Sequence, residues 1–546
     1  MMGHMLIWIE SLTAALLLAA LATALAARRR TRWAQALVAV VPSLWPLLVY
    51  AACVVGAGWL AFEMDMRPNY FAYSLLLALA YVGGAAWLLV KGLRRDEGGK
   101  PEALAWPAGR IAVALGVALA LQAVTFWNLD LAARLHVAAL RSEAGALALS
   151  AAPPRVPHHE NAATLYEAAF EAMGKPADWP EAWDKQWSEW IKDEHRDEFD
   201  PDDEGLRPFL AGKQPALALL RRAAAMPGCD FDRNYAQPSI AWVIPELTYQ
   251  MGAARLLALD ARVSLADRNT LRAIEDATAI FRMAGHVGND PLLISTLVAA
   301  TTEAIGAETL ATALATGNLT REALAAIQID ETLSFRRMLA RSLRVEEAFG
   351  LWVVSYFAGA TADPGFEEGT ELDLLHGGLG PLYRVFLLAD DLAAYRHTMQ
   401  RFQNFAARPY HEAREDWLAL PEYFEHDLPR RGPITVWLTP ALASAAAVVA
   451  RADANHRLAR LAEAVARHAL LRDAYPEDLG ALAPEWITVV PRDPFDREPL
   501  RMKRADDGGV ILYSIGPDAR DDGGRPWDDE KKCGDLVFRL PPVKAR

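Results

Sequence analysis

The histidine pair followed by glutamate, His158-His159-Glu160, is the group in this sequence that comes nearest to a metal-ligand motif. A zinc protease motif of the HExxH type needs histidine four residues after the first one, so that both imidazoles lie on one face of a helix. That position holds Ala163. The sequence also lacks a GxSxG nucleophile motif, a phosphate-binding P-loop and a GxGxxG dinucleotide motif before a helix. We therefore assign no catalytic residue.

Two helical segments carry closely spaced charges that would have a chemical role if they lay inside a helix bundle. Pairs of opposite charge three or four residues apart on a helix surface explain such charges more simply. We interpret them as surface pairs: Asp390 and Asp391 in one segment, and Arg341, Arg344, Glu346 and Glu347 in the other.

The uncharged run from Ile111 to Trp127 divides the chain into an apolar first part and a polar second part. A helix that crosses the hydrocarbon core of a bilayer needs about 20 mainly apolar residues. Three earlier runs, Leu6–Ala27, Ala34–Phe62 and Phe71–Val90, have a similar character. The sequence thus predicts a four-helix transmembrane domain over residues 1–130, with the lipid bilayer as a partner.

Arginine and lysine residues gather in the first and third loops between these runs, and the second loop holds only Arg67. Because positively charged loops stay in the cytoplasm, this pattern places both chain termini outside it. We expect a multi-pass protein of the bacterial inner membrane with an extracytoplasmic C-terminal part.

The composition of the chain limits the kinds of molecule that it can bind. The chain has 546 residues, a formal net charge of −13 and a hydrophobic content of 53%. An acidic chain without a basic stripe does not bind nucleic acid, because phosphate recognition needs a basic face. The cysteines Cys53, Cys229 and Cys533 show no metal-type spacing. Outside the cytoplasm Cys229 and Cys533 could form a disulfide, but we interpret them as unrelated thiols.

Residues 131–438 repeat an amphipathic helical pattern with short breaks, which predicts an all-α domain. Helices expected over Pro245–Leu265, Asn269–His286 and Pro291–Thr316 are joined by short loops and should pack as antiparallel helical hairpins. A tryptophan stripe is interpreted as an apolar packing face, and Gly359–Gly380 as a long surface loop. The stripe consists of Trp179, Trp183, Trp187 and Trp190.

Residues 439–546 follow a different plan. A long alanine-rich helix over Pro440–Leu471 precedes a Tyr475-Pro476 turn and a Pro491-Arg492-Asp493-Pro494-Phe495 loop. Two alternating segments, Leu500–Arg504 and Val510–Ile515, are separated by Asp506-Asp507-Gly508-Gly509, which predicts a hairpin. A third strand is expected over Asp535–Leu540, which gives a small α+β unit with a short antiparallel sheet.

This order of motifs resembles the globular half of the major pseudopilins of type II secretion. The resemblance rests on the helix, the Tyr-Pro turn, the Pro-x-Asp-Pro-aromatic loop and the strand that ends in Tyr513-Ser514-Ile515-Gly516-Pro517-Asp518. It covers about residues 440–540. The amino-terminal pilin signature, a glycine cleavage site before a Phe-Thr-Leu-x-Glu run, is missing at Met5–Glu10, so we do not expect processing or polymerisation as a pseudopilin.

Members of that family bind Ca²⁺ in the loop after this strand. The resemblance carries the ligand set onto Asp518, Asp521, Asp522 and Asp535, which bracket Gly523-Gly524. Ca²⁺ takes six to eight oxygen ligands, and glycines let a chain fold tightly around it. Lys531 and Lys532 lie in the same loop and would oppose a cation.

Three functions remain open from the sequence. The first is a non-catalytic, membrane-anchored extracytoplasmic binding or scaffold protein, linked to secretion or pilus-like machinery and bound to another envelope protein. The second is a membrane-bound hydrolase with catalytic residues dispersed in the helical domain. The third is a subunit of a transporter or channel. Function resides in sites, and a shared module gives only a prior expectation.

The calcium hypothesis has a direct test. Millimolar Ca²⁺ should raise the melting temperature of the C-terminal segment, because a ligand that binds only the folded state stabilises it. A melting temperature that does not respond to Ca²⁺ or to a chelator would remove the hypothesis.

Overall fold

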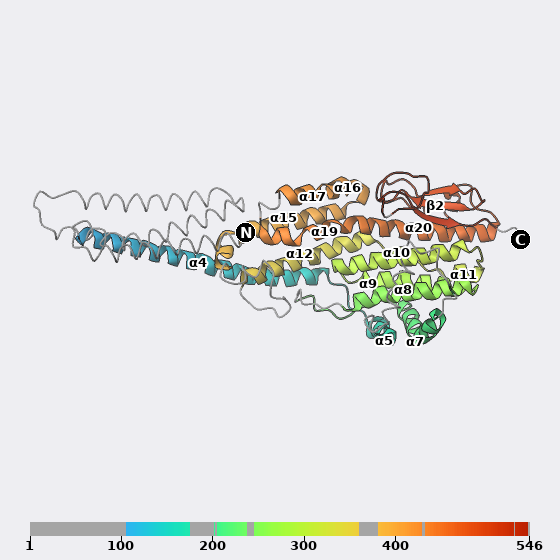
Figure 1. Cartoon of the computed structure of the whole chain (residues 1–546), viewed down its shortest axis with the longest axis horizontal. Helices are drawn as coiled ribbons and strands as arrows, with labels where there is room; N and C mark the ends of the chain where they lie inside the picture. Colours follow the sequence, from blue (N-terminus) through green and yellow to red (C-terminus); the bar gives the residue numbers. More distant parts are fainter. Residues whose placement is uncertain are drawn as a thin grey trace, which may run out of the picture.

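The computed structural model describes residues 105–174, 201, 205–236, 245–359, 380–427, 432–528 and 530–543. In these ranges the chain is mainly helical, with a three-stranded antiparallel sheet near its C-terminus. The body is elongated, and α20 runs parallel to its long axis in the half that holds the C-terminus, with the sheet against that helix (Figure 1). The sequence-based expectation of a mainly helical chain with a small antiparallel sheet is confirmed.

The elements follow one another in a simple order. They are α4 (Ala105–Ala151), η2 (His158–Glu160), α5 (Ala163–Met173), α7 (Leu206–Ala224), α8 (Pro245–Ala266), α9 (Thr270–Val287), α10 (Leu293–Ala315), α11 (Arg321–Ala325), α12 (Phe335–Gly359), α14 (Gly380–Phe386), α15 (Leu388–Ala407), α16 (Tyr410–Leu418), α17 (Leu420–Glu422), the π-helix η5 (Tyr423–Asp427), α18 (Pro433–Leu438), α19 (Pro440–Ala443), α20 (Ala445–Arg472), η6 (Leu479–Leu482), β1 (Arg501–Arg504), β2 (Val510–Ser514) and β3 (Leu536–Leu540).

Helix α4 contains the apolar run that the sequence assigned to a fourth membrane crossing. The helix is 47 residues long, and its second half carries charges and packs against α12. Within the described ranges, none of the helices has the length and apolarity that crossing a membrane requires. The predicted four-helix transmembrane anchor and the multi-pass placement in the inner membrane are therefore wrong. The other three proposed crossings, within residues 6–90, lie outside the described residues.

The charge at the end of that run is built into the helical body. Asp130 is buried, and its carboxylate lies 2.6 Å from the side chain of Arg384 and 2.8 Å from that of Arg134. Arg384 also donates a hydrogen bond to the backbone oxygen of Ala358, at 2.7 Å. The apolar run and Asp130 thus belong to the same helix, α4, and Asp130 pairs with Arg384 of α14. The hydropathy of the sequence alone does not reveal this contact.

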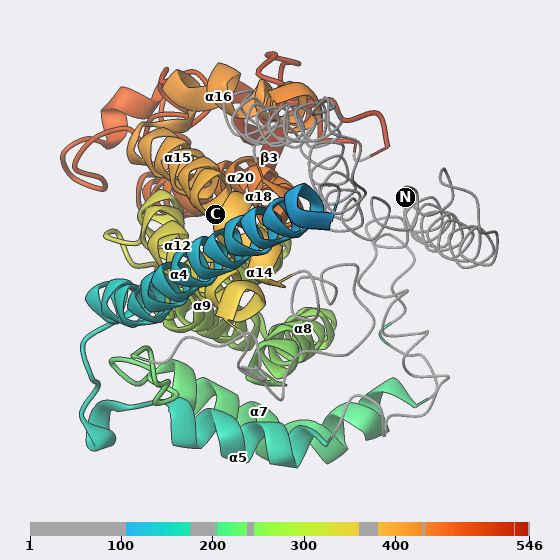
Figure 2. The ribbon, with the colours of Figure 1, turned by 90° about the vertical axis from the view of Figure 1, so that its left-hand side faces the viewer.

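Helices α8, α9 and α10 form the predicted antiparallel hairpins, with ends within a few residues of those expected. Alanines at helical spacing, such as Ala254, Ala273 and Ala277, are fully buried and allow close packing. At Gly306 a side-chain carbon would lie 3.2 Å from Ile280 and Phe281, so α10 lies unusually close to α9 there. Helices α5 and α7 pack together on the outer side of α8 and α9 (Figure 2).

Carboxylates from distant helices satisfy the first amide groups of several helices. The first N–H groups of a helix have no partner within the helix and need an acceptor. Asp391 of α15 accepts hydrogen bonds from the amides of Ile434 and Thr435 in α18, each at 3.0 Å. Glu346 of α12 accepts one from Leu293 of α10, at 3.1 Å. These contacts connect helices that are far apart in the sequence.

The sequence-based interpretation of Asp391 and Arg341 as members of surface charge pairs is wrong. Asp391 is fully buried. Arg341 donates hydrogen bonds to the backbone oxygens of Gly288 and Asn289, at 2.7 and 2.6 Å, beyond the C-terminus of α9. A cation at the C-terminal end of a helix is favourable because the last carbonyl groups point toward it. The charges therefore join helices to one another.

Helix α20 contributes to two hydrophobic cores. Ala446 and Val449, near its start, pack in a core with α12 and α15. Leu458, Leu461 and Val465 pack in a second core that also includes α9, α10, α11 and the sheet. The C-terminal sheet and the helical body therefore share one helix, and the boundary predicted at residue 439 stays a prediction.

The sheet has the order β1-β2-β3, with Met502 opposite Leu512 and Leu512 opposite Phe538. The Asp493 carboxylate joins the loop before the sheet to the end of β2. It accepts hydrogen bonds from the Ser514 hydroxyl and the Ile515 amide, each at 2.9 Å. The two motifs that carry the resemblance to pseudopilins are thus linked to each other in space, and this link fixes the loop Arg492–Arg497.

A first prediction concerns Asp391. Replacing it with alanine leaves the amides of Ile434 and Thr435 and the Tyr383 hydroxyl, which donates to Asp391 at 2.9 Å, without their acceptor. We expect Asp391→Ala to lower the free energy of unfolding by roughly 2–3 kcal/mol. Urea denaturation measures this change. The neighbouring Asp390→Ala is the matched control and should change it by less than about 0.5 kcal/mol; equal effects would contradict the capping role.

A second prediction concerns pH. Burial raises the pKa of Glu346 to about 7, and the hydrogen bond from the Leu293 amide opposes the rise. The folded chain therefore holds a proton that the unfolded chain, with an ordinary glutamate pKa of 4.5, releases. The stability that this group contributes is present below pH 4.5 and is lost as the pH rises through about 7.

The Glu346→Gln variant keeps an acceptor oxygen but does not titrate. Relative to that of the parent chain, its free energy of unfolding should therefore increase as the pH rises from 5 to about 7. Glu347→Gln, at a neighbouring residue that accepts from Gln403 at 2.7 Å, is the control and should follow the parent. Parallel pH profiles for Glu346→Gln and the parent would contradict the assignment.

Candidate functional site

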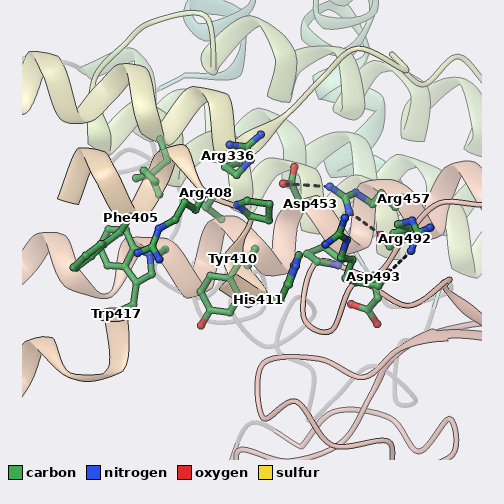
Figure 3. A pocket seen from close by; sticks show the side chains of 18 residues that line it. Arg336, Phe405, Arg408, Tyr410, His411, Trp417, Asp453, Arg457, Arg492 and Asp493 are labelled. Atoms are coloured by element: carbon green, nitrogen blue, oxygen red, sulfur yellow. Dashed lines mark hydrogen bonds and ion pairs between the residues drawn. The ribbon is translucent and has the colours of Figure 1, made fainter. Parts of the chain in front are cut away.

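A cavity of about 240 Å³ lies where the helical body meets the C-terminal loop. Its walls come from α12, α15, α16 and α20, together with the loop Arg492–Arg497. Phe405 and Trp417 lie at one end, with the Arg408 guanidinium over the Phe405 ring, and Arg457 and Arg492 lie at the other end, with Tyr410 and His411 between them (Figure 3). This separation gives the cavity an apolar end and a charged end.

The apolar end is well ordered by ring packing. Trp417 of α16 packs edge-on against Phe405 of α15, with ring centroids 5.5 Å apart, and stacks on Phe402 at 5.7 Å. Leu339 of α12 and Val449 of α20 are buried and line the cavity beside these rings. An apolar or aromatic group placed here would be removed from water.

The charged end contains guanidinium groups that are bonded mainly to neutral oxygens. Arg336 donates to the backbone oxygen of Ala407 at 2.6 Å, and Arg457 to that of Arg492 at 2.7 Å. The Arg492 side chain donates to the backbone oxygen of Arg497 at 3.0 Å. Backbone oxygens orient these side chains and leave their full positive charge in place.

Carboxylates neutralise only part of this charge. The cavity lining has five arginines and two aspartates, and one of the arginines, Arg408, pairs with Asp416 outside the lining. The Asp493 carboxylate already accepts hydrogen bonds from the Ser514 hydroxyl and the Ile515 amide. It also accepts one from the Arg501 guanidinium, which lies outside the cavity lining, at 3.3 Å. The excess of positive charge favours an anionic ligand.

Asp453 is the acidic group deep in the cavity wall, with 8% of its surface exposed. One carboxylate oxygen accepts a hydrogen bond from the Phe335 amide at the start of α12, at 2.9 Å, and the other lies 3.8 Å from Arg457. Burial raises the pKa of Asp453, and Arg457 acts in the opposite direction. The residue therefore joins the cavity to the N-terminus of α12.

His411 is the other titratable group in the wall that bears on the cavity chemistry. Its Nε2 atom is buried without a hydrogen-bond partner in the described part of the chain, 3.5 Å from a Glu412 carboxylate oxygen. The His411 amide donates to the backbone oxygen of Pro494, at 3.2 Å, which ties α16 to the C-terminal loop.

The four aspartates of the calcium hypothesis lie after β2, but each has other partners. Asp521 pairs with Arg501 at 3.1 Å and Asp522 with Arg525 at 3.2 Å. Buried Asp535 accepts hydrogen bonds from the amides of Asp522 and Gly524, at 3.3 and 2.6 Å. The Asp518 carboxylate accepts from the amides of Arg520 and Gly534.

The structure does not group these carboxylates around a common point. No cluster of three or more histidine, cysteine, aspartate or glutamate side chains with a metal-site arrangement occurs among the described residues. Ca²⁺ binding would require Asp521 to leave Arg501 and Asp522 to leave Arg525. The Ca²⁺ site stays a prediction.

Other sequence-based interpretations have mixed outcomes. Cys229 and Cys533 are free thiols, as expected. His158–Glu160 forms a short 3-10 turn, and its histidines are exposed. The tryptophan stripe and most of the Gly359–Gly380 segment lie outside the described residues.

A second, smaller cavity of about 20 Å³ lies among α8, α9 and the segment Cys229–Tyr235. Arg233 crosses it and pairs with both Glu246 and Asp290, and Tyr235 donates to Asp290 at 2.6 Å. A volume of this size is comparable with a single water molecule. Its charges already pair with one another, so it is a packing feature of the helical body.

The residues of the larger cavity escaped sequence reasoning because they are spread over residues 336–497 and none belongs to a catalytic motif. One signal was available: Arg492 lies inside the Pro-x-Asp-Pro loop, where the neighbouring Asp493 is structural. Comparison with known proteins adds nothing to this assignment, since no family model, curated protein or solved structure matches the chain.

Proposed function

We propose that this chain is a non-catalytic binding protein whose larger cavity takes a small ligand with one anionic group and an apolar body. This keeps the binding role of the first sequence-based hypothesis and drops the membrane anchor. The observation that carries the proposal is the charged end, where Arg336, Arg457 and Arg492 are positioned by backbone oxygens and keep their positive charge.

The anionic group belongs at Arg457. This side chain is 35% exposed, is held by the Arg492 backbone oxygen, and contacts Asp453 only at 3.8 Å. A carboxylate, sulfonate or phosphate would accept charge-assisted hydrogen bonds from its remaining donors, which are about twice as strong as neutral ones. Arg492 and Arg497, at the exposed rim of the cavity, add to the attraction.

The apolar body belongs between Phe405, Trp417 and Val449. Small-ligand sites are mostly apolar with a few placed polar groups that fix orientation, and this cavity has that composition. Burial of an aromatic ring against Phe405 and Trp417 would supply most of the binding energy, at about 25 cal/mol for each Å² of apolar surface removed from water. The arginines would then set the orientation of the ligand.

The alternatives from the sequence have weaker support. Hydrolysis through a serine, threonine or cysteine nucleophile has no support in this cavity, because the residues that line it include none of these three types. The hypothesis of a transporter or channel subunit depended on the transmembrane anchor, which the helices in the described part of the chain do not support.

The test uses naphthalene-2-sulfonate, which combines a permanent negative charge with an aromatic body. Isothermal titration calorimetry on the full chain should show binding with a stoichiometry of one. Arg457→Gln removes the central charge and should weaken binding by roughly tenfold or more, which is about 1.4 kcal/mol.

Two controls define the result. Arg539→Gln removes an exposed arginine that pairs with Asp507 on the sheet, away from the cavity, and should leave the affinity unchanged. The neutral naphthalene-2-sulfonamide, of nearly the same shape, should bind at least tenfold more weakly than the sulfonate. Equal affinities for the two compounds, or no binding of either, would contradict the proposal.

A further inference from the structure

Behind the charged end of the cavity lies a buried pair of titratable groups, Glu303 of α10 and His456 of α20. Glu303 is fully buried and His456 is 4% exposed. His456 Nδ1 lies 2.8 Å from a Glu303 carboxylate oxygen, and its Nε2 lies 2.8 Å from the backbone oxygen of Asp330. The pair clamps α20 to α10 and to the chain segment before α12.

The hydrogen-bond partners fix how many protons this pair holds. The backbone oxygen of Asp330 can only accept, so Nε2 of His456 carries a proton. The 2.8 Å contact between Nδ1 and the carboxylate needs one further proton between the two atoms. Whichever partner holds that proton, the pair is electrically neutral as a unit, and losing it would leave an uncompensated buried charge.

Asp453 is the group between this neutral pair and the cavity. It lies three residues before His456 on α20, and the charge of His456 lowers the pKa of Asp453. The charged groups that face it are Arg457 on α20 and Arg336 on α12, with His456 behind it. Arg492, Arg497, Arg408, Asp493 and His411 line the same cavity from the other elements.

We propose that the cavity takes up a proton together with its anionic ligand, and that the proton goes to the Asp453 carboxylate. This inference rests on the proposed binding function and adds its regulation by pH. In the unliganded chain, Arg457 and Arg336 face Asp453 and favour its ionised form. An anion at Arg457 neutralises that guanidinium and adds a like charge near the carboxylate, so protonation of Asp453 becomes favourable.

The geometry allows this protonation at little structural cost. The oxygen that accepts from the Phe335 amide can keep this bond in the neutral acid, because the proton can reside on the other oxygen, which faces the cavity. The helix α12 therefore keeps its N-terminal acceptor. Burial of Asp453 acts in the same direction, since it raises the pKa of the carboxyl group.

The consequence is an affinity that falls as the pH rises. If one proton is taken up with each ligand, the affinity decreases by up to tenfold per pH unit. Naphthalene-2-sulfonate suits the measurement, because its own charge does not change between pH 5 and 8. We expect its dissociation constant to increase at least threefold between pH 5.5 and 7.5.

Calorimetry on the full chain tests the proton transfer without any variant. The apparent binding enthalpy should differ between phosphate and Tris buffers, whose ionisation enthalpies differ, by an amount that gives the protons taken up per ligand. An uptake between zero and one that declines at both pH extremes supports the proposal. Binding with no buffer dependence and a dissociation constant that stays within twofold from pH 5.5 to 7.5 overturns it.

Two variants identify the group. Asp453→Asn keeps an acceptor for the Phe335 amide, and it should bind the sulfonate at pH 7.5 at least as tightly as the parent, with no pH dependence. His411→Gln removes the imidazole that lines the cavity, and it should keep the pH dependence. The reverse result, with the dependence lost only in His411→Gln, overturns the assignment to Asp453.

The outcomes separate the two proposals. Binding that does not depend on pH contradicts proton uptake and leaves the binding function standing. Absence of sulfonate binding at every pH contradicts both.

Discussion

Burial of helix α20 in two hydrophobic cores is the constraint on which the rest of the described structure depends. Residues near its start share a core with α12 and α15, and its later residues share a second core with α10, α11 and the sheet. Its alanine-rich sequence lets these elements approach closely, so long polar side chains emerge only along the seams between them. Arg457 and Asp453 lie on such a seam, which is why the cavity forms where the helical body meets the C-terminal loop.

Polar groups stabilise this arrangement because each buried carboxylate has a defined partner. Asp391, Glu346 and Asp453 accept hydrogen bonds from the first amides of α18, α10 and α12, and Asp493 joins two loops of the C-terminal unit. A buried polar group that is hydrogen-bonded costs far less free energy than an unpaired one. These contacts also determine which helix ends meet, which non-directional apolar packing does not specify.

Much of the local structure could be predicted from the sequence, and the long-range contacts could not. Apolar periodicity located α8, α9 and α10, and alternation with turn residues located the three strands. Asp391 and Glu346 look like surface residues in a local window, since their partners are about 50 residues away. The apolar run before Asp130 shows the same limit: it met a membrane criterion locally, but the buried ion pair with Arg384 shows that its helix continues into the protein. The cavity was missed because its arginines come from four separate parts of the chain: α12, the α15–α16 connection, α20 and the loop Arg492–Arg497.

Placement of an amphipathic anion in the cavity is the central claim, and its position can be observed directly. A crystal structure of the chain with 6-bromonaphthalene-2-sulfonate, recorded at the bromine absorption edge, would locate the bromine by anomalous scattering. We expect one bromine peak beside Phe405 and Trp417, with the sulfonate at Arg457. A bromine peak at the Arg457 end, or one elsewhere with none in the cavity, would contradict it.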